Sequence, residues 1–358
     1  MQLAAVRHIY EAPEPVATVY MESQAVSPDA EHEVRLRWDG LRQQLADAGA
    51  PQEALDALDD VILDTEAFGA IQAEGRVLVA DRTGLLLDED FDATGEKGDR
   101  AVLGPLAELG DYLRQRLRSV RALVVLADQE RATIRREVFT STDVLESGRE
   151  TQVEGSSYET VHKPREGALH HRRMQQRSED AASQNIRDIT ERVRKVAAKW
   201  KPDVVAVAGE VQGRKLLLDE FPPELAEIAR EVEAGGGISS GSADQSAEDS
   251  LAEELATLAR YLTIERVREQ TERFGNAQGN NLAVEGAENV RRAVQLGAVD
   301  TLLLRYDQPA EDEDSLLRAS AKVDASVALV GTSVTENVAA VLRYEAPVDE
   351  MDSSPTSG

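Results

Sequence analysis

The stretch that decides the fold class is AVEGAENVRRAVQLGAVDTLLLR, residues 283–305. It predicts a helix from Glu285 to Leu296, followed by a turn at Gly297 and an apolar strand from Val299 to Arg305. A helix that leads directly into a buried strand is a building unit of α/β domains. This part of the chain is therefore predicted to fold as an α/β domain.

Helices and strands also alternate upstream of this stretch. Apolar runs predict buried strands from Arg121 to Ala127 and from Asp203 to Gly209. Between them, apolar residues at helical spacing predict a long helix from Leu169 to Trp200, and another is predicted from Ser246 to Phe274. The first third predicts a strand, two helices, a hairpin and a further helix: Val16–Tyr20, 27–49, Gln52–Thr65, 76–87 and Pro105–Arg118. The predicted fold class of the whole chain is α/β.

The length of 358 residues suits two or three domains rather than a single core. The clearest linker is the glycine-rich run from Gly235 to Gly241. The end of the chain is rich in proline, serine and aspartate, which predicts a disordered tail. The predicted organisation is an N-terminal α/β domain, a middle domain, a C-terminal α/β domain and a disordered tail: 1–119, 120–236, 237–345 and 346–358.

Composition excludes several classes of site. The chain has no cysteine, which excludes disulfides, thiolate metal sites and cysteine nucleophiles, and its five histidines leave little room for histidine-rich metal sites. No cofactor or metal is predicted. The formal charge of −27 argues against indiscriminate binding to nucleic acid or anionic membranes. No stretch is long and apolar enough for a membrane helix, and the N-terminus lacks a signal-peptide pattern, so the predicted location is cytoplasmic.

One segment has the opposite charge to the rest of the chain. Val161 to Lys201 contains eleven basic and five acidic residues, and three of the five histidines. A solvated helix face is the usual explanation for such a charge run. The predicted position at a loop-to-helix junction and the arginine-rich composition favour phosphate contacts instead. We therefore predict nucleic-acid binding by this segment.

Other motifs predict no catalytic site. Asp88 to Asp99 resembles a calcium-binding loop, but Ala93 replaces the glycine of the turn and Asp99 replaces the bidentate glutamate, which favours a polar surface loop. The glycine-rich run lacks the lysine and hydroxyl of a phosphate-binding loop. A two-metal nuclease needs clustered acids, whereas Asp128 and Asp203 are too few and suit turns.

The stretch at residues 283–305 resembles the C-terminal-domain signature of the archaeal and eukaryotic release-factor family and its relative Pelota. The order that precedes it is also similar: a strand, the three glycines at residues 235–237, and a long helix ending near Phe274. The resemblance covers about residues 120–344. It implies three domains, with an RNase-H-like middle domain and a C-terminal α/β/α sandwich.

Within that family the middle domain carries a Gly-Gly-Gln loop before a long basic helix, and this loop enters the peptidyl-transferase centre. The matching residues here are HKPREGALHHRR, residues 162–173, which lack the tripeptide. Two glycines allow the backbone to approach the ester closely, whereas Pro164 has no N–H and Arg165 and Glu166 add bulk. Hydrolysis of peptidyl-tRNA by the family mechanism is therefore not expected.

The chain is most similar to members of this superfamily that lack the tripeptide, the Balon-type ribosome hibernation factors widespread in actinobacteria. That resemblance implies a stress-response factor without catalytic residues that occupies the A site of the 70S ribosome, with elongation factor Tu as a second partner. The residues it implies for rRNA binding are His162, Lys163, Arg165, Gly167, His170, His171, Arg172, Arg173 and Arg177. The alternative is a peptidyl-tRNA hydrolase of ribosome rescue that uses Gln175 or Gln176.

Overall fold

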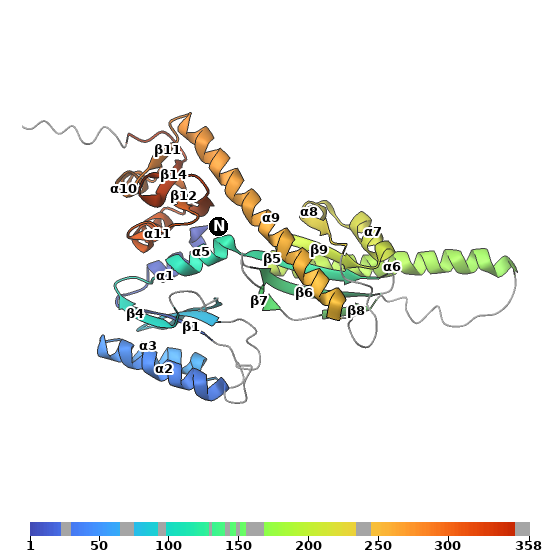
Figure 1. Cartoon of the computed structure of the whole chain (residues 1–358), viewed down its shortest axis with the longest axis horizontal. Coiled ribbons are helices and arrows are strands. Elements are labelled where there is room, and N and C mark those ends of the chain that lie inside the picture. Colours follow the sequence, from blue (N-terminus) through green and yellow to red (C-terminus); the bar gives the residue numbers. More distant parts are fainter. Residues whose placement is uncertain are drawn as a thin grey trace, which may run out of the picture. The chain divides into compact units, whose positions relative to one another are not determined.

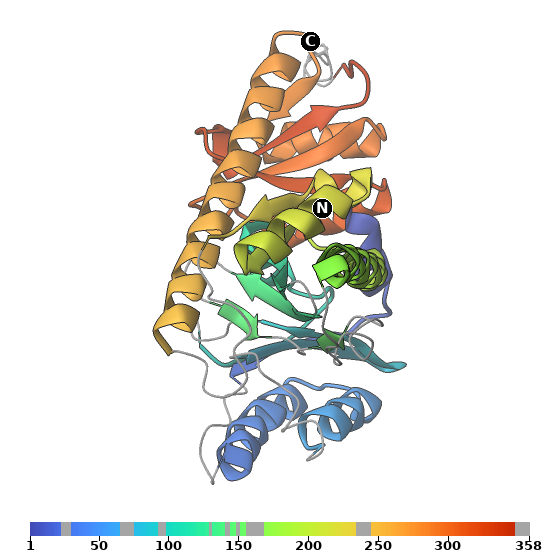
Figure 2. The ribbon, with the colours of Figure 1, turned by 90° about the vertical axis from the view of Figure 1, so that its right-hand side faces the viewer.

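The computed structural model describes residues 1–22, 30–64, 75–91, 98–128, 131–139, 144–147, 151–154, 168–233 and 245–347. The chain forms two compact units. The discontinuous unit combines Met1–Arg118 with Thr263–Gly358, and the middle unit is Ser119–Leu262. Each unit contains sheets covered by helices, which confirms the predicted α/β class (Figures 1 and 2).

The N-terminal part of the discontinuous unit is an antiparallel sheet with strand order β3-β2-β1-β4. Its strands are β1 (Val16–Glu22), β2 (Gly75–Asp81), β3 (Gly84–Asp90) and β4 (Arg100–Gly104). The predicted hairpin over residues 76–87 is confirmed as β2 and β3. Two helices, α2 (Ala30–Asp47) and α3 (Gln52–Ile62), lie below this sheet in Figure 2. They bury Trp38 and Leu58 against Val19 and its apolar neighbours on that face.

The C-terminal part of the same unit is a second sheet, with strand order β11-β14-β12-β13. Its elements are β11 (Ala283–Glu285), α10 (Ala287–Gln295), β12 (Val299–Arg305), α11 (Glu313–Lys322), β13 (Ser326–Val330), η3 (Thr335–Asn337) and β14 (Val338–Leu342). Apolar residues of α10 and α11 pack with Leu302 and Leu304 on one face. Phe274 of the long helix α9 (Gln245–Gln278) packs with Leu303 on the other. This arrangement is the predicted α/β/α sandwich.

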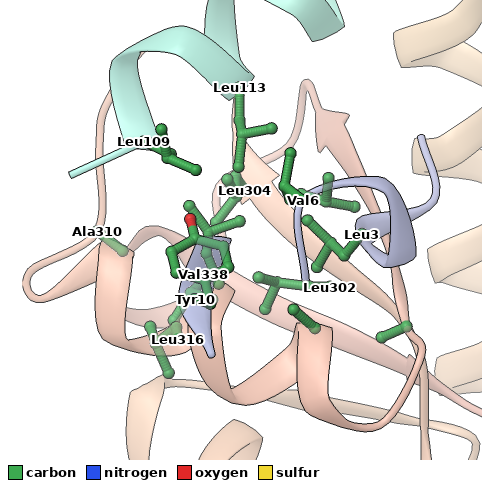
Figure 3. Packing of buried hydrophobic residues seen from close by; sticks show 14 of the residues in the cluster. Leu3, Val6, Tyr10, Leu109, Leu113, Leu302, Leu304, Ala310, Leu316 and Val338 are labelled. Atoms are coloured by element: carbon green, nitrogen blue, oxygen red, sulfur yellow. The ribbon is translucent and has the colours of Figure 1, made fainter. Parts of the chain in front are cut away.

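The first residues of the chain pack against this C-terminal sheet. The N–H of Leu3 donates to the Ala325 carbonyl at 3.1 Å, and the Met1 carbonyl accepts from the N–H of Val327 at 2.8 Å. The short helices η1 (Leu3–Ala5) and α1 (Arg7–Tyr10) follow. Their apolar side chains share one core with those of α5 (Gly110–Arg118) and α11 (Figure 3). The discontinuous unit is thus held together by segments distant in sequence.

A buried ion pair lies in the same region. Arg114 of α5 donates from Nε to Glu313 Oε1 at 2.6 Å and from Nη2 to Glu313 Oε2 at 2.7 Å. Both side chains are more than nine-tenths buried. Arg114 also donates to the carbonyls of Arg305 and Gln308, and the N–H of Ala310 donates to Glu313. Both charges therefore have several hydrogen-bond partners, as buried charges require.

The middle unit is built on a third sheet, with strand order β10-β9-β5-β6-β7 and β8 also paired to β6. Its strands are β5 (Val120–Ala127), β6 (Arg131–Phe139), β7 (Val144–Ser147), β8 (Thr151–Glu154), β9 (Val204–Gly209) and β10 (Ala229–Glu231). The antiparallel strands β5, β6 and β7 are followed by β9 and β10, which run parallel to β5. This order is the RNase-H-like arrangement predicted for the middle domain.

Helices cover both faces of the middle sheet. One face packs against α6 (Ala168–Trp200) and α7 (Val211–Glu220), through Ile189 and Leu217 among others. The other face packs against the first half of α9 through Leu251 and Leu255. The short helix α8 (Pro223–Ala226) precedes β10. The long helices predicted from Leu169 and from Ser246 are confirmed as α6 and α9.

Some boundaries differ from the sequence prediction. The helix predicted from Pro105 begins only at Gly110, because residues 105–109 are irregular. The sequence pattern also did not predict β4, which pairs with β1. The N–H of Gly110 donates to Asp314 Oδ1 at 2.7 Å, a partner too distant in sequence for a local pattern to show. The domain boundaries at residues 119, 236 and 345 stay predictions. The linker at residues 235–241 and the tail from residue 348 lie outside the described residues.

Candidate nucleic-acid interface

The basic segment predicted to bind nucleic acid falls largely on α6. His170, His171, Arg172, Arg173 and Arg177 lie in the first turns of this helix, as do the two glutamines of the hydrolase alternative at residues 175 and 176. The other predicted contacts lie outside the described residues: His162, Lys163, Arg165 and Gly167. The structure thus places five of the nine predicted residues on one helix.

The second half of α6 is fixed on the sheet by apolar side chains at helical spacing. Ile186, Ile189, Val193 and Ala197 are buried against the middle sheet. Residues three or four apart share a face of a helix, so this stripe leaves the basic residues on the remaining surface. The exposed basic residues in the second half of α6 are therefore held on a helix that is packed against the sheet.

A basic pocket lies where α6 meets β6. The cavity has a volume of about 450 Å³. On the helix its lining residues are spaced by three and four, and on the strand they alternate, so each set points to one side. The pocket is lined by Ile134, Arg136, Arg192, Lys195, Val196, Lys199 and Trp200. Four cations, two aliphatic side chains and one indole make a surface suited to a phosphate and an adjoining base.

Among the described residues, three of the four cations have no acidic partner. In the part of the chain that the structure describes, Arg136, Arg192 and Lys199 form no ion pair. Lys195 lies 3.5 Å from Glu191, which also accepts two hydrogen bonds from Arg194 at 2.9 Å. These hydrogen bonds hold the pKa of Glu191 below its usual value. The pocket keeps a net positive charge in a chain whose overall charge is strongly negative.

Trp200 contributes the aromatic part of the pocket. It is the last residue of α6 and is partly exposed. The Arg121 guanidinium carbon lies 4.8 Å from its ring centroid, a cation–π contact that orients the indole. The chain turns at Lys201 in the left-handed region, and the N–H of Arg121 donates to Asp203 Oδ2 at 2.8 Å. Arg121 therefore orients the indole beside the pocket without a ligand.

The larger cavity of the discontinuous unit has the opposite character. Its volume is about 580 Å³, and its lining includes Glu108, Asp111, Asp312 and Asp314. Burial raises the pKa of Asp314 to about 6. An acidic lining repels phosphate, so this cavity is no candidate for nucleic-acid binding. Among the described residues, no group of three or more acidic or histidine side chains could hold a metal ion.

The acids considered for a nuclease have structural roles. Asp128 Oδ1 accepts from the N–H of Arg131 at 2.7 Å, in the turn between β5 and β6. Asp203 accepts from the Arg121 N–H at the start of β9. Glu137 on β6 lies on the face opposite Arg136, where burial raises its pKa to about 7. The described acids therefore provide the turns and the core of the sheet, which agrees with the sequence interpretation of Asp128 and Asp203.

Comparison with known proteins gives a family match for the middle of the chain. The family model described as bacterial archaeo-eukaryotic release factor family 2 matches residues 121–280, which include all residues of the basic pocket. Over these residues, the chain is similar to bacterial release factors of this family. This match agrees with the release-factor resemblance stated from the sequence, for residues 121–280.

Individual relatives are distant. The homologue is 27% identical over 320 residues to the uncharacterized protein Rv2629 of Mycobacterium tuberculosis H37Rv, which covers 85% of this chain and 78% of that protein. Among solved structures it is similar to S. cerevisiae Dom34, a translation termination-like factor, at 13% identity and a TM-score of 0.43, over 64% of this chain and 65% of Dom34. It is also similar to a ribosome-bound archaeal Pelota, at 15% identity and a TM-score of 0.41, over 96% and 94% of the two chains.

Arg192, Lys195 and Lys199 belong to the basic segment at residues 161–201, but none of them was among the predicted rRNA contacts. Their spacing of three and four residues along a predicted helix was the available signal. Arg136 lies on a strand outside the segment, and only the pairing of that strand beside α6 brings it to the pocket. In the sequence, Trp200 served only to mark the end of the predicted helix.

Proposed function

We propose that this homologue is a ribosome hibernation factor that occupies the A site of the 70S ribosome as a mimic of tRNA or a release factor. The observation that carries the proposal is the family match over residues 121–280, in which a basic helix belongs to an otherwise acidic chain. Helix N-termini and arginines are favourable partners for rRNA phosphates. Such a factor acts in the cytoplasm. Within the described ranges, no helix has the length and apolarity to cross a bilayer.

The start of α6 and the loop before it are the part proposed to reach the peptidyl-transferase centre. At the N-terminus of α6 the first N–H groups have no partner within the helix, and the helix dipole places its positive end there. Histidines and arginines at residues 170–173 add hydrogen-bond donors and stacking planes suited to unpaired rRNA. In this proposal the N-terminal domain faces the decoding centre and the C-terminal sandwich contacts the stalk base or elongation factor Tu.

The factor is proposed to occupy the centre without hydrolysing peptidyl-tRNA. Catalysis of that hydrolysis requires a water held in line with the ester. The sequence HKPREGALHHRR at residues 162–173 lacks the two glycines and the glutamine that serve this purpose in the family. Bulky, charged side chains take their place, which suits occupation of the site better than delivery of water.

A peptide-release assay separates the two functions. Ribosomes with labelled peptidyl-tRNA in the P site are incubated with excess factor, and free peptide is measured over time. We expect release no faster than without factor, because no residue positions a water. The variant with Gln175→Ala and Gln176→Ala is expected to bind ribosomes as well as the wild type. Multiple-turnover release that disappears in this variant would instead establish the hydrolase.

A further inference from the structure

The basic pocket on the second half of α6 has the dimensions and chemistry of a nucleotide site. Its volume of about 450 Å³ is within the range of small-ligand sites, about 300–1,000 Å³. Ile134, which is 1% exposed, and Val196 form the apolar floor of the pocket, and Trp200 lies beside them. Arg136, Arg192 and Lys199 supply the charge. Proteins that bind single strands use this combination of a cationic groove and an aromatic stacking surface.

The charge of the pocket requires an explanation. Elsewhere on the described surface most arginines pair with acids, as Arg187 does with Glu220 and Arg194 with Glu191. The chain has 67 acidic residues against 40 basic ones, so partners are abundant. Three cations that have no ion pair among the described residues converge on one cavity, and they disfavour each other unless an anion is bound. A phosphodiester would relieve this repulsion, and the guanidinium groups can bind its oxygens in bidentate fashion.

We infer that this pocket binds one unpaired nucleotide of a single-stranded RNA, with the phosphate at Arg136, Arg192 and Lys199 and the base against Trp200. The inference deepens the proposed function and rests on it for the choice of RNA as the polymer. It adds a second RNA contact to the helix, separate from the predicted contacts at residues 162–177. Double-helical RNA does not fit the inference, because its bases are stacked and cannot reach an indole in a pocket.

Tryptophan fluorescence of the full-length protein tests the inference directly. The chain has two tryptophans. Trp38 is fully buried, with its Nε1–H donating to Asp59 at 2.7 Å, so only Trp200 can respond to a ligand in the pocket. We expect a short oligouridylate to quench the fluorescence saturably, and salt to weaken its binding. A blunt-ended RNA duplex without unpaired nucleotides should quench little.

The variant with Arg192→Ala and Lys199→Ala should weaken oligouridylate binding about tenfold or more and reduce the slope of log affinity against log salt by about 1.4, since each single-strand phosphate contact contributes about 0.7. The matched control is Arg194→Ala with Lys215→Ala. It removes the same charge from exposed residues of α6 and α7 that do not line the pocket. The control should bind as the wild type does.

Three outcomes would overturn the inference: no quenching, equal weakening in both double variants, or equally tight binding of inorganic phosphate. The last would identify a small-anion site. Because no ribosome is present, the result is separate from the proposed function. If the protein binds ribosomes but not oligouridylate, the inference about the pocket is wrong and the proposed function stands. If it binds oligouridylate but never associates with ribosomes, the proposed function is wrong and the inference about the pocket stands.

Discussion

Replacing Arg114 with methionine is expected to lower the free energy of unfolding of the discontinuous unit by about 3–5 kcal/mol, the cost of leaving one member of a buried ion pair alone. Methionine keeps much of the side-chain volume and removes the charge. Glu313 would then be a buried carboxylate that keeps only the N–H of Ala310. The carbonyls of Arg305 and Gln308 would also lose their donor.

Denaturant unfolding followed by fluorescence measures this loss. In a Trp200→Phe background the remaining tryptophan is Trp38, which lies in the core of the N-terminal sheet of the same unit. Arg268→Met is the matched control. Its guanidinium pairs with Glu265 at 2.7 Å but is largely exposed, so the expected change is below about 1 kcal/mol.

Adding Glu313→Gln to Arg114→Met should recover part of the loss. The glutamine has no charge to desolvate and can still accept from Ala310. The role assigned to the buried pair would be wrong if Arg114→Met were no more destabilising than the surface control Arg268→Met.

Reversing the charge of Arg172 and Arg173 is expected to weaken ribosome binding by roughly 100-fold, since two charge-assisted hydrogen bonds contribute about 1.5 kcal/mol each. These residues lie near the start of α6, in the part proposed to contact rRNA. The slope of log affinity against log salt should become shallower by about 1.4–1.8, because each lost phosphate contact removes about 0.7–0.9.

Cosedimentation with 70S ribosomes at several salt concentrations gives both quantities. The control is Arg187→Glu with Arg194→Glu, which makes the same change in net charge on the same helix. Both control residues are exposed and already paired with acids. We expect the control to bind nearly as well as the wild type. Equal weakening in the two double variants would mean that total charge, rather than the start of α6, governs binding.

Local patterns predicted the elements that carry their own signal. The long helices α6 and α9 follow from apolar spacing, and the buried strands β5, β9 and β12 follow from apolar runs. The start of α5 could not be predicted, because its first N–H is satisfied by Asp314, about two hundred residues later. The packing of Leu3 and Tyr10 on the C-terminal sheet could not be predicted either, because their partners are distant in the chain.

The candidate site was predictable in part for the same reason. The excess of basic residues between residues 161 and 201 is visible in composition alone. The pocket is not visible in composition, because it combines Arg136 of strand β6 with cationic residues of α6. Within the described part of the chain, Arg192 and Lys199 have no acidic partner, which the sequence could not show because acids are abundant throughout it.

Puromycin reactivity tests the proposed occupation of the A site most directly. Ribosomes with peptidyl-tRNA in the P site are mixed with increasing factor, and the rate of peptidyl-puromycin formation is measured. A factor whose loop fills the peptidyl-transferase centre should reduce this rate in proportion to the fraction of ribosomes bound, and the variant with Arg172→Glu and Arg173→Glu should need much higher concentrations. An unchanged rate on ribosomes saturated with factor would show that binding is peripheral and would contradict the account.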